Sequence, residues 1–126
     1  MPRSTTPGTG TNLSVLIGSL SRLPELRTLP SGDSLLAIDV TVRAADGRAE
    51  SVPVTWIGAP PAAAGWPAGH EVLVVGRVRR RFFRAGGATQ SRTEVVAATV
   101  VPTRRTATAR KALVSALESL SAVAAG

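Results

Sequence analysis

The chain has 126 residues, enough for one domain and a tail but too few for two domains. Hydrophobic residues make up 44% of the sequence but aromatic residues only 3%, so the core must be built from Val, Leu, Ile and Ala. A net charge of +7 favours a polyanionic partner such as DNA, RNA or an anionic membrane. The absence of cysteine excludes disulfide bonds and thiolate metal sites.

The first segment, residues 1–11, is rich in Pro, Gly, Ser and Thr and predicts a flexible N-terminal arm. It carries no apolar stretch, which argues against a signal peptide. No apolar run in the sequence approaches the roughly 20 residues that a membrane-spanning helix needs. We therefore expect a cytoplasmic protein with no membrane partner.

Residues 12–20 predict the first strand, because Leu13, Val15 and Ile17 alternate onto one face. Gly18 within this run indicates a bulge or a sharp bend. Residues 21–34 contain two prolines and a Ser-Gly dipeptide, a composition that predicts a turn.

The second strand is predicted at residues 34–43 and the third at residues 51–57, with a hairpin at Asp46-Gly47 between them. Alternation places Trp56 in the core with the aliphatic residues of both strands, which are Leu36, Ile38, Val40, Val42, Val52 and Val54. Pro53 indicates an edge or a bulge position.

The loop at residues 58–69 is rich in Pro and Gly, so it predicts at most one helical turn, anchored by the packing of Trp66. The fourth strand begins at Glu71 and the fifth ends near Pro102. Five strands with turn signals between them indicate an all-β fold, a small closed barrel.

Residues 103–126 predict a basic linker followed by a C-terminal amphipathic helix. The helix covers residues 107–124, with an apolar stripe of Leu113, Leu117 and Leu120. We interpret the stripe as an intramolecular packing face, with a subunit or partner contact as the alternative. Four basic residues crowd the helix start, namely Arg104, Arg105, Arg110 and Lys111. The helix dipole disfavours positive charge there, so contact with a polyanion and chance are the two explanations.

The most strongly charged stretch, residues 76–96, joins the fourth and fifth strands. Its candidate nucleic-acid-binding residues are Arg77, Arg79, Arg80, Arg81, Phe83, Arg84 and Arg92. Arginine offers phosphate oxygens a permanent charge and a planar fork of donors, and a phenyl ring offers a base a stacking surface. Gly86 and Gly87 predict a flexible tip, so the stretch predicts a long, positively charged hairpin. A charged strand edge that resists aggregation is the alternative.

Strand alternation divides this hairpin into two faces. Arg77, Arg79, Arg81 and Phe83 share one face, so we favour Phe83 as the stacking ring. Phe82 falls on the other face and is predicted in the core or in a subunit interface. Outside the hairpin, Arg27 and Arg43 are further candidates; Arg27 can instead pair with Glu25, and Arg43 lies on the wet face of the second strand.

Three stretches carry recognisable motifs. Residues 12–32 read NLSVLIGSL and then LPELRTLPSG, close to a pattern N-x-V-x-L-x-G-x-L, P-E-L/V-R, P-S/N-G. Residues 72–83 read V-x-V-x-G-x-x-R-x-R-x-F, and residues 92–96 read RTEVV. Over residues 12–101 the chain resembles the bacterial single-stranded DNA-binding protein family.

The resemblance implies a five-stranded oligonucleotide-binding (OB) fold over residues 12–102. It also implies a homo-oligomer, a tetramer or a dimer, that coats single-stranded DNA in replication, recombination and repair and is nucleoid-associated. Phe83 falls where the family has a stacking aromatic residue, but the corresponding third-strand positions are Ser51 and Ile57. The family's acidic C-terminal tip has no counterpart, which indicates a specialised paralogue or a reduced member.

We therefore predict a protein that binds single-stranded DNA with little sequence preference, through arginines and stacking at Phe83. The alternatives are an RNA-binding barrel and an oligomeric interaction scaffold with weakened nucleic-acid binding. We expect no enzymatic activity, cofactor or metal, because no paired catalytic carboxylates or phosphate-binding loop appear in the sequence. The lone His70 is expected at the surface, since one histidine cannot form a metal site or a catalytic triad.

Overall fold

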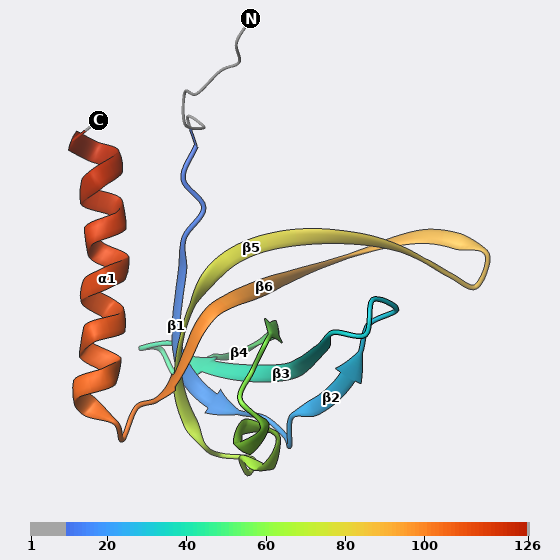
Figure 1. Ribbon diagram of the computed structural model, residues 1–126, viewed down its shortest axis with the longest axis horizontal. Coiled ribbons are helices and arrows are strands. Elements are labelled where there is room, and N and C mark those ends of the chain that lie inside the picture. The colour runs from blue at the N-terminus through green and yellow to red at the C-terminus, as the bar shows by residue number, and fades with distance from the viewer. Residues whose placement is uncertain (1–9, 126) are drawn as a thin grey trace, which may run out of the picture.

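The computed structural model describes the backbone of residues 10–125 and the side chains of residues 10–120. Residues 1–9 of the predicted N-terminal arm lie outside the described residues. The elements, in chain order, are β1 (Ser14–Leu20), β2 (Glu25–Thr28), β3 (Ser34–Arg43), β4 (Ala49–Ile57), the 3₁₀ helix η1 (Pro61–Gly65), β5 (Glu71–Ala85), β6 (Ala88–Pro102) and α1 (Thr106–Ala125) (Figure 1). In this described part, neither helix has the length and apolarity to cross a membrane. The chain is mostly β with one C-terminal α-helix, as the sequence predicts.

The strands form one sheet in the order β1-β5-β6-β4-β3-β2, and β1 also pairs with β3, so the sheet closes into a ring. The closing contact is short, because only Ser19 and Leu20 of β1 pair with β3. Neighbours around the ring are antiparallel except β4 and β6, which run parallel where Val54–Thr55 lie beside Val95–Val96. Closure pairs backbone groups that an open sheet would leave at its edges.

The segment predicted as a turn, residues 21–34, contains the additional strand β2, which pairs with β3. Both of its prolines lie outside that strand: Pro24 precedes it, and Pro30 lies in the turn that follows. Gly32 in this turn has a φ of +93°, a left-handed conformation that glycine adopts without strain. The prolines bound a short strand and do not exclude one.

Aliphatic side chains and one tryptophan fill the interior of the ring. Trp56 is 8% exposed, which confirms its predicted place in the core. The buried aliphatic residues around it include Leu20, Leu36, Ile38, Val40, Val54, Val72, Val74, Val95 and Val100. On β1, Leu16 and Leu20 pack against this core, whereas Val15 and Ile17 are 41% and 50% exposed. The apolar face that alternation predicts for the first strand is therefore its outer face.

Two glycines lie where backbones approach closely. A Cβ atom on Gly18 would lie 2.3 Å from the backbone oxygen of Thr41, so a hydrogen at this position lets β1 meet β3. A Cβ atom on Gly76 would lie 2.2 Å from the backbone oxygen of Val96, beside a shift in the β5–β6 register. The β5–β6 pairing is thus irregular at Gly76. At Gly18, β1 stays paired with β5 and no bulge occurs.

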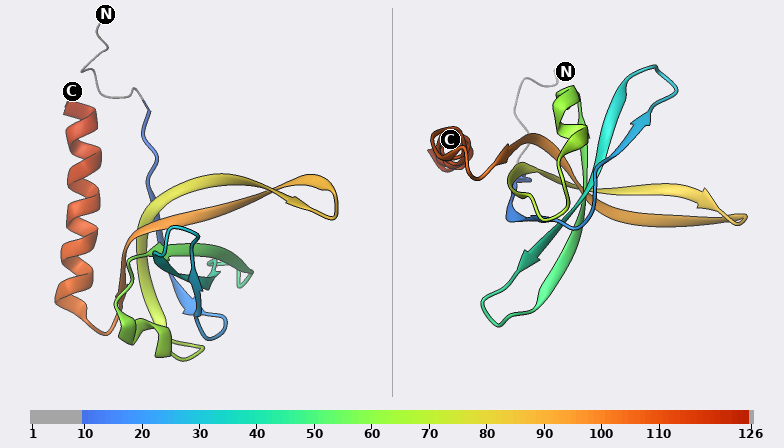
Figure 2. Two further views of the ribbon diagram at one scale, coloured as in Figure 1. Left: turned by 45° about the vertical axis from the view of Figure 1, so that its right-hand side comes forward. Right: turned by 90° about the horizontal axis from the view of Figure 1, so that it is seen from below.

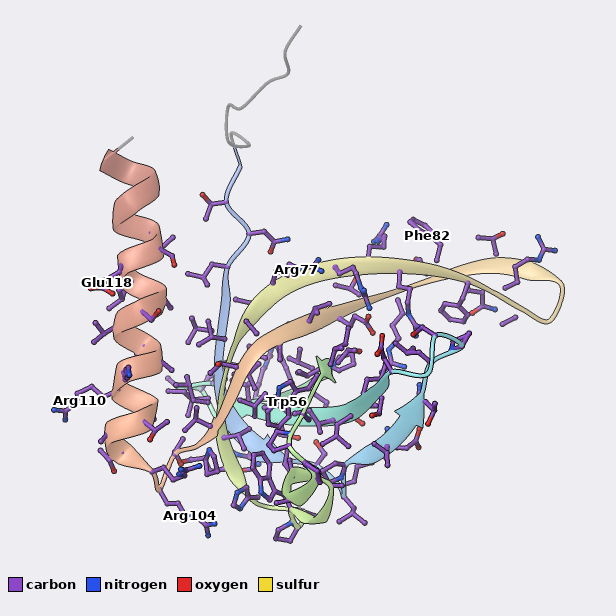
Figure 3. The ribbon with its side chains drawn as sticks, in the orientation of Figure 1. Trp56, Arg77, Phe82, Arg104, Arg110 and Glu118 are labelled. Carbon is purple, nitrogen blue, oxygen red and sulfur yellow. The ribbon has the colours of Figure 1, made fainter. Side chains whose placement is uncertain are left out.

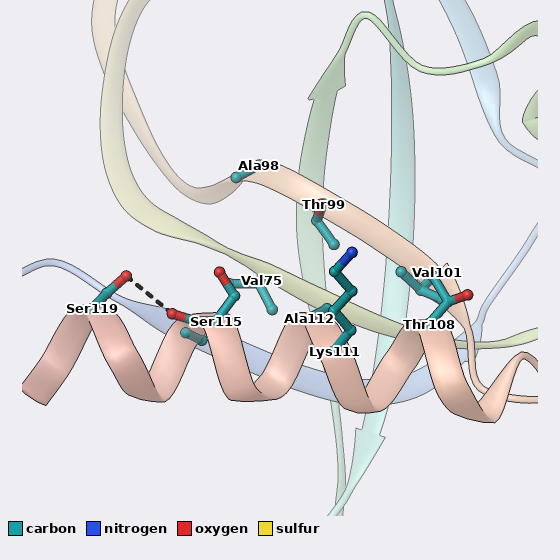
Figure 4. A pocket seen from close by; sticks show the side chains of 10 residues that line it. Val75, Ala98, Thr99, Val101, Thr108, Lys111, Ala112, Ser115 and Ser119 are labelled. Atoms are coloured by element: carbon teal, nitrogen blue, oxygen red, sulfur yellow. Dashed lines mark hydrogen bonds between the residues drawn. The ribbon is translucent and has the colours of Figure 1, made fainter.

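Helix α1 lies beside the ring, against β5 and β6 (Figure 2). Its small side chains allow this approach: Ala116 is 6% exposed, and Val101 of β6 is also buried. A groove of about 420 Å³ runs between the helix and these strands and is bordered by Lys111 (Figure 4). The predicted intramolecular packing stripe is wrong for Leu117 and Leu120, which are 61% and 41% exposed.

Candidate nucleic-acid interface

The β5–β6 hairpin extends well beyond the ring (Figure 1). Pairing of β1 with β5 ends at Ser14 and Gly76, and pairing of β4 with β6 ends at Val95. Beyond these points the hairpin is a two-stranded ribbon, which continues in register to Ala85 and Ala88. Two glycines with φ angles of +59° and +81° form its tip. The hairpin and its glycine tip are thus confirmed.

The ribbon has two faces with different side chains. One face carries alternate residues of β5 from Arg77 to Phe83 and, on β6, the cross-strand partners of the last three; we call it the arginine face, and it consists of Arg77, Arg79, Arg81, Phe83, Gln90, Arg92 and Glu94. The opposite face consists of Val78, Arg80, Phe82, Arg84, Thr89, Ser91 and Thr93. The arginine face therefore carries four cations and a phenyl ring beside a single carboxylate.

The two phenylalanines lie on opposite faces and are both exposed. Phe82 is 66% exposed and stands off the outer side of the ribbon (Figure 3), so its predicted place in the core is wrong. The ribbon has left the ring at this point, and Phe82 therefore has no core to enter. Phe83 is 37% exposed, and the guanidinium carbon of Arg81 lies 5.7 Å from the centre of its ring. This cation–π contact orients Phe83 on the arginine face.

Glu94 is the one buried charged residue among the described side chains. It lies opposite Arg79, and its carboxylate accepts hydrogen bonds from both Nε and Nη2 of that residue. Its other oxygen, Oε1, accepts a hydrogen bond from the hydroxyl of Thr55 at 3.2 Å, and Nε of Arg81 lies 3.9 Å from Oε2. Burial alone raises the pKa of Glu94, but Arg79, Arg81 and Thr55 together lower it below its ordinary value.

The other arginines of the hairpin differ in their contacts. Arg84 donates a hydrogen bond from Nη2 to the carbonyl oxygen of Gly87 at 2.9 Å and so braces the tip. Arg77, Arg80 and Arg92 are exposed and form no ion pair with the described side chains. These three guanidinium groups are accessible to an anionic ligand.

Two predicted residues lie outside the hairpin, at opposite ends of β3. Arg27 lies on β2 beside the start of β3, and its hydrogen bond and charge lower the pKa of the Glu25 carboxyl. Arg43 ends β3 and donates a hydrogen bond to the carbonyl oxygen of Gly47 at 3.2 Å. The fold thus separates Arg27 and Arg43 by the length of β3.

The outward positions of β4 hold no aromatic ring: Ser51 is exposed and Ile57 is 49% exposed. The tryptophans pack together instead, with the ring centres of Trp56 and Trp66 5.7 Å apart. This contact confirms the predicted anchoring of the loop by Trp66. The ring centre of His70 lies 5.0 Å from that of Trp66, and its Nε2 is buried although the residue as a whole is half-buried, so the expected surface position is wrong for this ring nitrogen only.

Two further residues that shape the hairpin, Glu94 and Asn12, were not predicted as site residues. The side-chain amide of Asn12 donates a hydrogen bond to the carbonyl of Val78 at 2.7 Å and accepts one from its N–H at 2.9 Å. The sequence signal for Glu94 is the glycine tip, which sets the register and pairs Glu94 with Arg79. Asn12 has no comparable signal, because its contact joins residues 66 positions apart.

The basic residues at the start of α1 form a separate positive region. Arg104 and Arg110 project near the lower end of the helix, far from the hairpin tip (Figure 3). Arg105 and Lys111 are also exposed. Within residues 10–125, no group of three or more His, Asp or Glu side chains is placed to hold a metal ion. The hairpin itself presents guanidinium groups and phenyl rings.

No protein-family model matches this chain, and no curated protein matches it.

Proposed function

We propose that this chain is a sequence-independent single-stranded DNA-binding protein built on an OB-fold barrel. The observation that carries the proposal is the arginine face, which displays four arginines and Phe83 on a ribbon extending from the ring. Guanidinium groups bind the phosphates of a flexible strand and release its counterions, and a phenyl ring stacks on a base of any identity. Neither contact reads a sequence.

The strand order supports the barrel in this proposal. An OB fold is a five-stranded, partly open Greek-key barrel that binds oligonucleotides with the face of its second and third strands and with the loop between its fourth and fifth. The ring here runs β1-β3-β4-β6-β5, with a short closing contact between β1 and β3. The elements in the corresponding places are β3, β4 and the β5–β6 hairpin.

The number of aromatic rings in the site determines how the binding free energy divides between base stacking and electrostatic contacts. Only Phe83 offers a ring on the arginine face, and the outward residues Ser51 and Ile57 of β4 add none. Stacking contributes about 1 to 3 kcal/mol per base, so one ring supplies less free energy than several would. We therefore expect a large salt-dependent share of the binding free energy.

A titration of labelled oligo-dT over a salt series tests this function. We expect a linear fall of log K with log salt, and tighter binding of oligo-dT than of a duplex of the same length. Replacing Arg77 and Arg92 with Gln removes two accessible cations of the arginine face, and the slope should decrease by about 1.4. The matched control, Arg104→Gln with Arg105→Gln, removes the same charge away from the hairpin. A flat salt response, or equal losses in both variants, would contradict the proposal.

An RNA-binding barrel requires the same surface, and competition between oligo-dT and oligo-U separates the two. Preference for oligo-U would assign the site to RNA.

A second candidate function is an oligomeric interaction scaffold. The exposed Leu117 and Leu120 of α1 and the exposed Val15 and Ile17 of β1 favour it, because such side chains cost free energy in water. Sedimentation of the full chain beside a Leu117→Ser, Leu120→Ser variant tests this role. A lower mass in the variant, together with weak oligo-dT binding by the parent chain, would favour the scaffold.

A further inference from the structure

The carboxylate of Glu94 lies where the ribbon leaves the ring. The Glu94 side chain is 4% exposed, whereas those of Arg79 and Arg81 on the same face are 34% and 46% exposed. A buried charge is costly unless it is both paired and hydrogen-bonded. Glu94 meets both conditions, and the resulting low pKa keeps it ionised near neutral pH.

Both oxygens of this carboxylate are engaged. Oε2 accepts hydrogen bonds from Nε and Nη2 of Arg79, and Oε1 accepts one from the hydroxyl of Thr55 on β4. The two donors of Arg79 form the planar fork that fits carboxylate and phosphate oxygens alike. Glu94 therefore occupies the position on Arg79 that a phosphate of a bound strand would take.

We propose that Glu94 takes the place of a phosphate on Arg79. This contact makes Arg79 a structural support at the base of the ribbon and leaves it unavailable for nucleic-acid binding. The inference rests on the proposed function, because it divides the arginine face into residues that contact the strand and one that supports them. Thr55 fixes the carboxylate to β4, so Thr55, Glu94 and Arg79 together tie the ribbon to the ring. Arg79 becomes a positioning residue.

Arg81 differs from Arg79 in a way that keeps it available. Its Nε lies 3.9 Å from Glu94, beyond hydrogen-bond distance, and its guanidinium group lies beside the ring of Phe83. With Arg77 and Arg92, it gives the arginine face three groups for phosphates. Three contacts correspond to a salt slope of about 2.1 from this face, compared with about 2.8 if Arg79 contributed.

The variant Glu94→Gln tests this division. Glutamine keeps the shape and an oxygen for Thr55 but loses the charge, so a phosphate can displace it from Arg79. The matched control is Glu118→Gln, which makes the same change of net charge at an exposed site on α1. The measurement is the affinity for oligo-dT over a salt series, with circular dichroism to verify that each variant is folded.

We expect the slope of Glu94→Gln to be steeper than that of Glu118→Gln by about 0.7, the value for one added phosphate contact. Adding Arg79→Gln to Glu94→Gln should return the slope to the control value. This double variant also removes both charges of the buried pair, so it can be compared with the parent chain if the single variant unfolds. The salt slope of the double variant should then equal that of the parent chain.

Equal slopes in Glu94→Gln and Glu118→Gln would overturn the inference and leave the proposed function intact. A double variant with a shallower slope than the parent chain would also overturn it, because Arg79 would then be a phosphate ligand. A parent chain that does not bind oligo-dT would instead refute the proposed function, and the inference with it.

Discussion

The side-chain amide of Asn12 forms two hydrogen bonds with the backbone of Val78, one in each direction. Backbone pairing of β1 with β5 ends at Ser14 and Gly76, so this contact lies two residues beyond it. Asn12 thus acts as one more strand residue, with its amide in place of a peptide group. The contact fastens the base of the hairpin to the start of β1.

Asn12→Ala should therefore loosen the hairpin at its base. A net hydrogen bond contributes about 0.5 to 1.5 kcal/mol, so the loss of two predicts about 5- to 150-fold faster hydrogen exchange at the Val78 amide. Asn12→Asp retains the acceptor for that amide and should show a smaller increase. Hydrogen exchange measured by NMR distinguishes the variants. Unchanged exchange in Asn12→Ala would show that Asn12 does not hold the base of the hairpin.

The two phenylalanines should contribute unequally to binding. Phe83 is oriented by Arg81 on the arginine face, so Phe83→Ala should weaken oligo-dT binding by about 1 to 3 kcal/mol. Phe82 is more exposed but lies on the opposite face, and we expect a smaller loss for Phe82→Ala. Titrations of both variants with oligo-dT at one salt concentration compare the two losses of affinity. A larger loss for Phe82→Ala would contradict this prediction. Melting temperatures should change little, because neither ring is buried.

Gly18→Ala should destabilise the ring. Its methyl group would meet the backbone of Thr41, and overpacking of this kind typically costs about 1 to 3 kcal/mol. A loss of that size lowers the melting temperature by about 4 to 8 °C per kcal/mol in a domain of about this size. Gly65→Ala is the control, since a Cβ atom there meets no atom within 4 Å. Equal melting temperatures for the two variants would show that β1 can move away from β3.

Glu94 should make part of the stability acid-sensitive. Its folded-state pKa lies below the ordinary value of 4.5, so the carboxylate stabilises the fold above that pH. This contribution is lost as the pH falls from about 4.5 through the lowered pKa. Glu94→Gln lacks it, so the difference in unfolding free energy between parent and variant should shrink on acidification. Urea denaturation from pH 7 to pH 3 measures the trend, and a constant difference would contradict it.

Alternation along the chain was sufficient to predict the central strands. The second predicted strand, residues 34–43, has the same bounds as β3, because aliphatic residues occupy every second position from Leu36 to Val42 and polar residues flank them at Ser34 and Arg43. Trp56 was placed in the core for the same reason. Residues 25–28 gave no such signal, since all four side chains of β2 are exposed and only pairing with β3 makes them a strand.

Alternation and helical spacing identify a face but not what the face contacts. Leu117 and Leu120 share a stripe, yet α1 uses smaller side chains such as Ala116 to approach the ring. Parity with Val78 predicts Phe82 in the core or in a subunit interface, but no third strand or second layer among the described residues covers the ribbon at this point. Whether these side chains are buried depends on where the ring ends, and the local sequence around each residue does not determine that.

The pairing of Arg79 with Glu94 was within reach of the sequence. A turn at Gly86 and Gly87 places each residue of β5 opposite a defined residue of β6, and Glu94 falls opposite Arg79. What the sequence does not contain is the contact of Glu94 with Thr55, because it depends on the parallel approach of β4 and β6.

Within the described residues, the side-chain hydrogen bonds from Asn12 and Thr55 join the ribbon beyond Gly76 to the rest of the molecule at its base, and its two strands stay in step up to the tip. Insertion or deletion of matched residue pairs would therefore alter its reach by about 3.4 Å per pair and leave the packed interior untouched. The length of the hairpin can thus change independently of the ring. Related chains can acquire different footprints on a polymer by changing its length, with no need to redesign the scaffold that supports it.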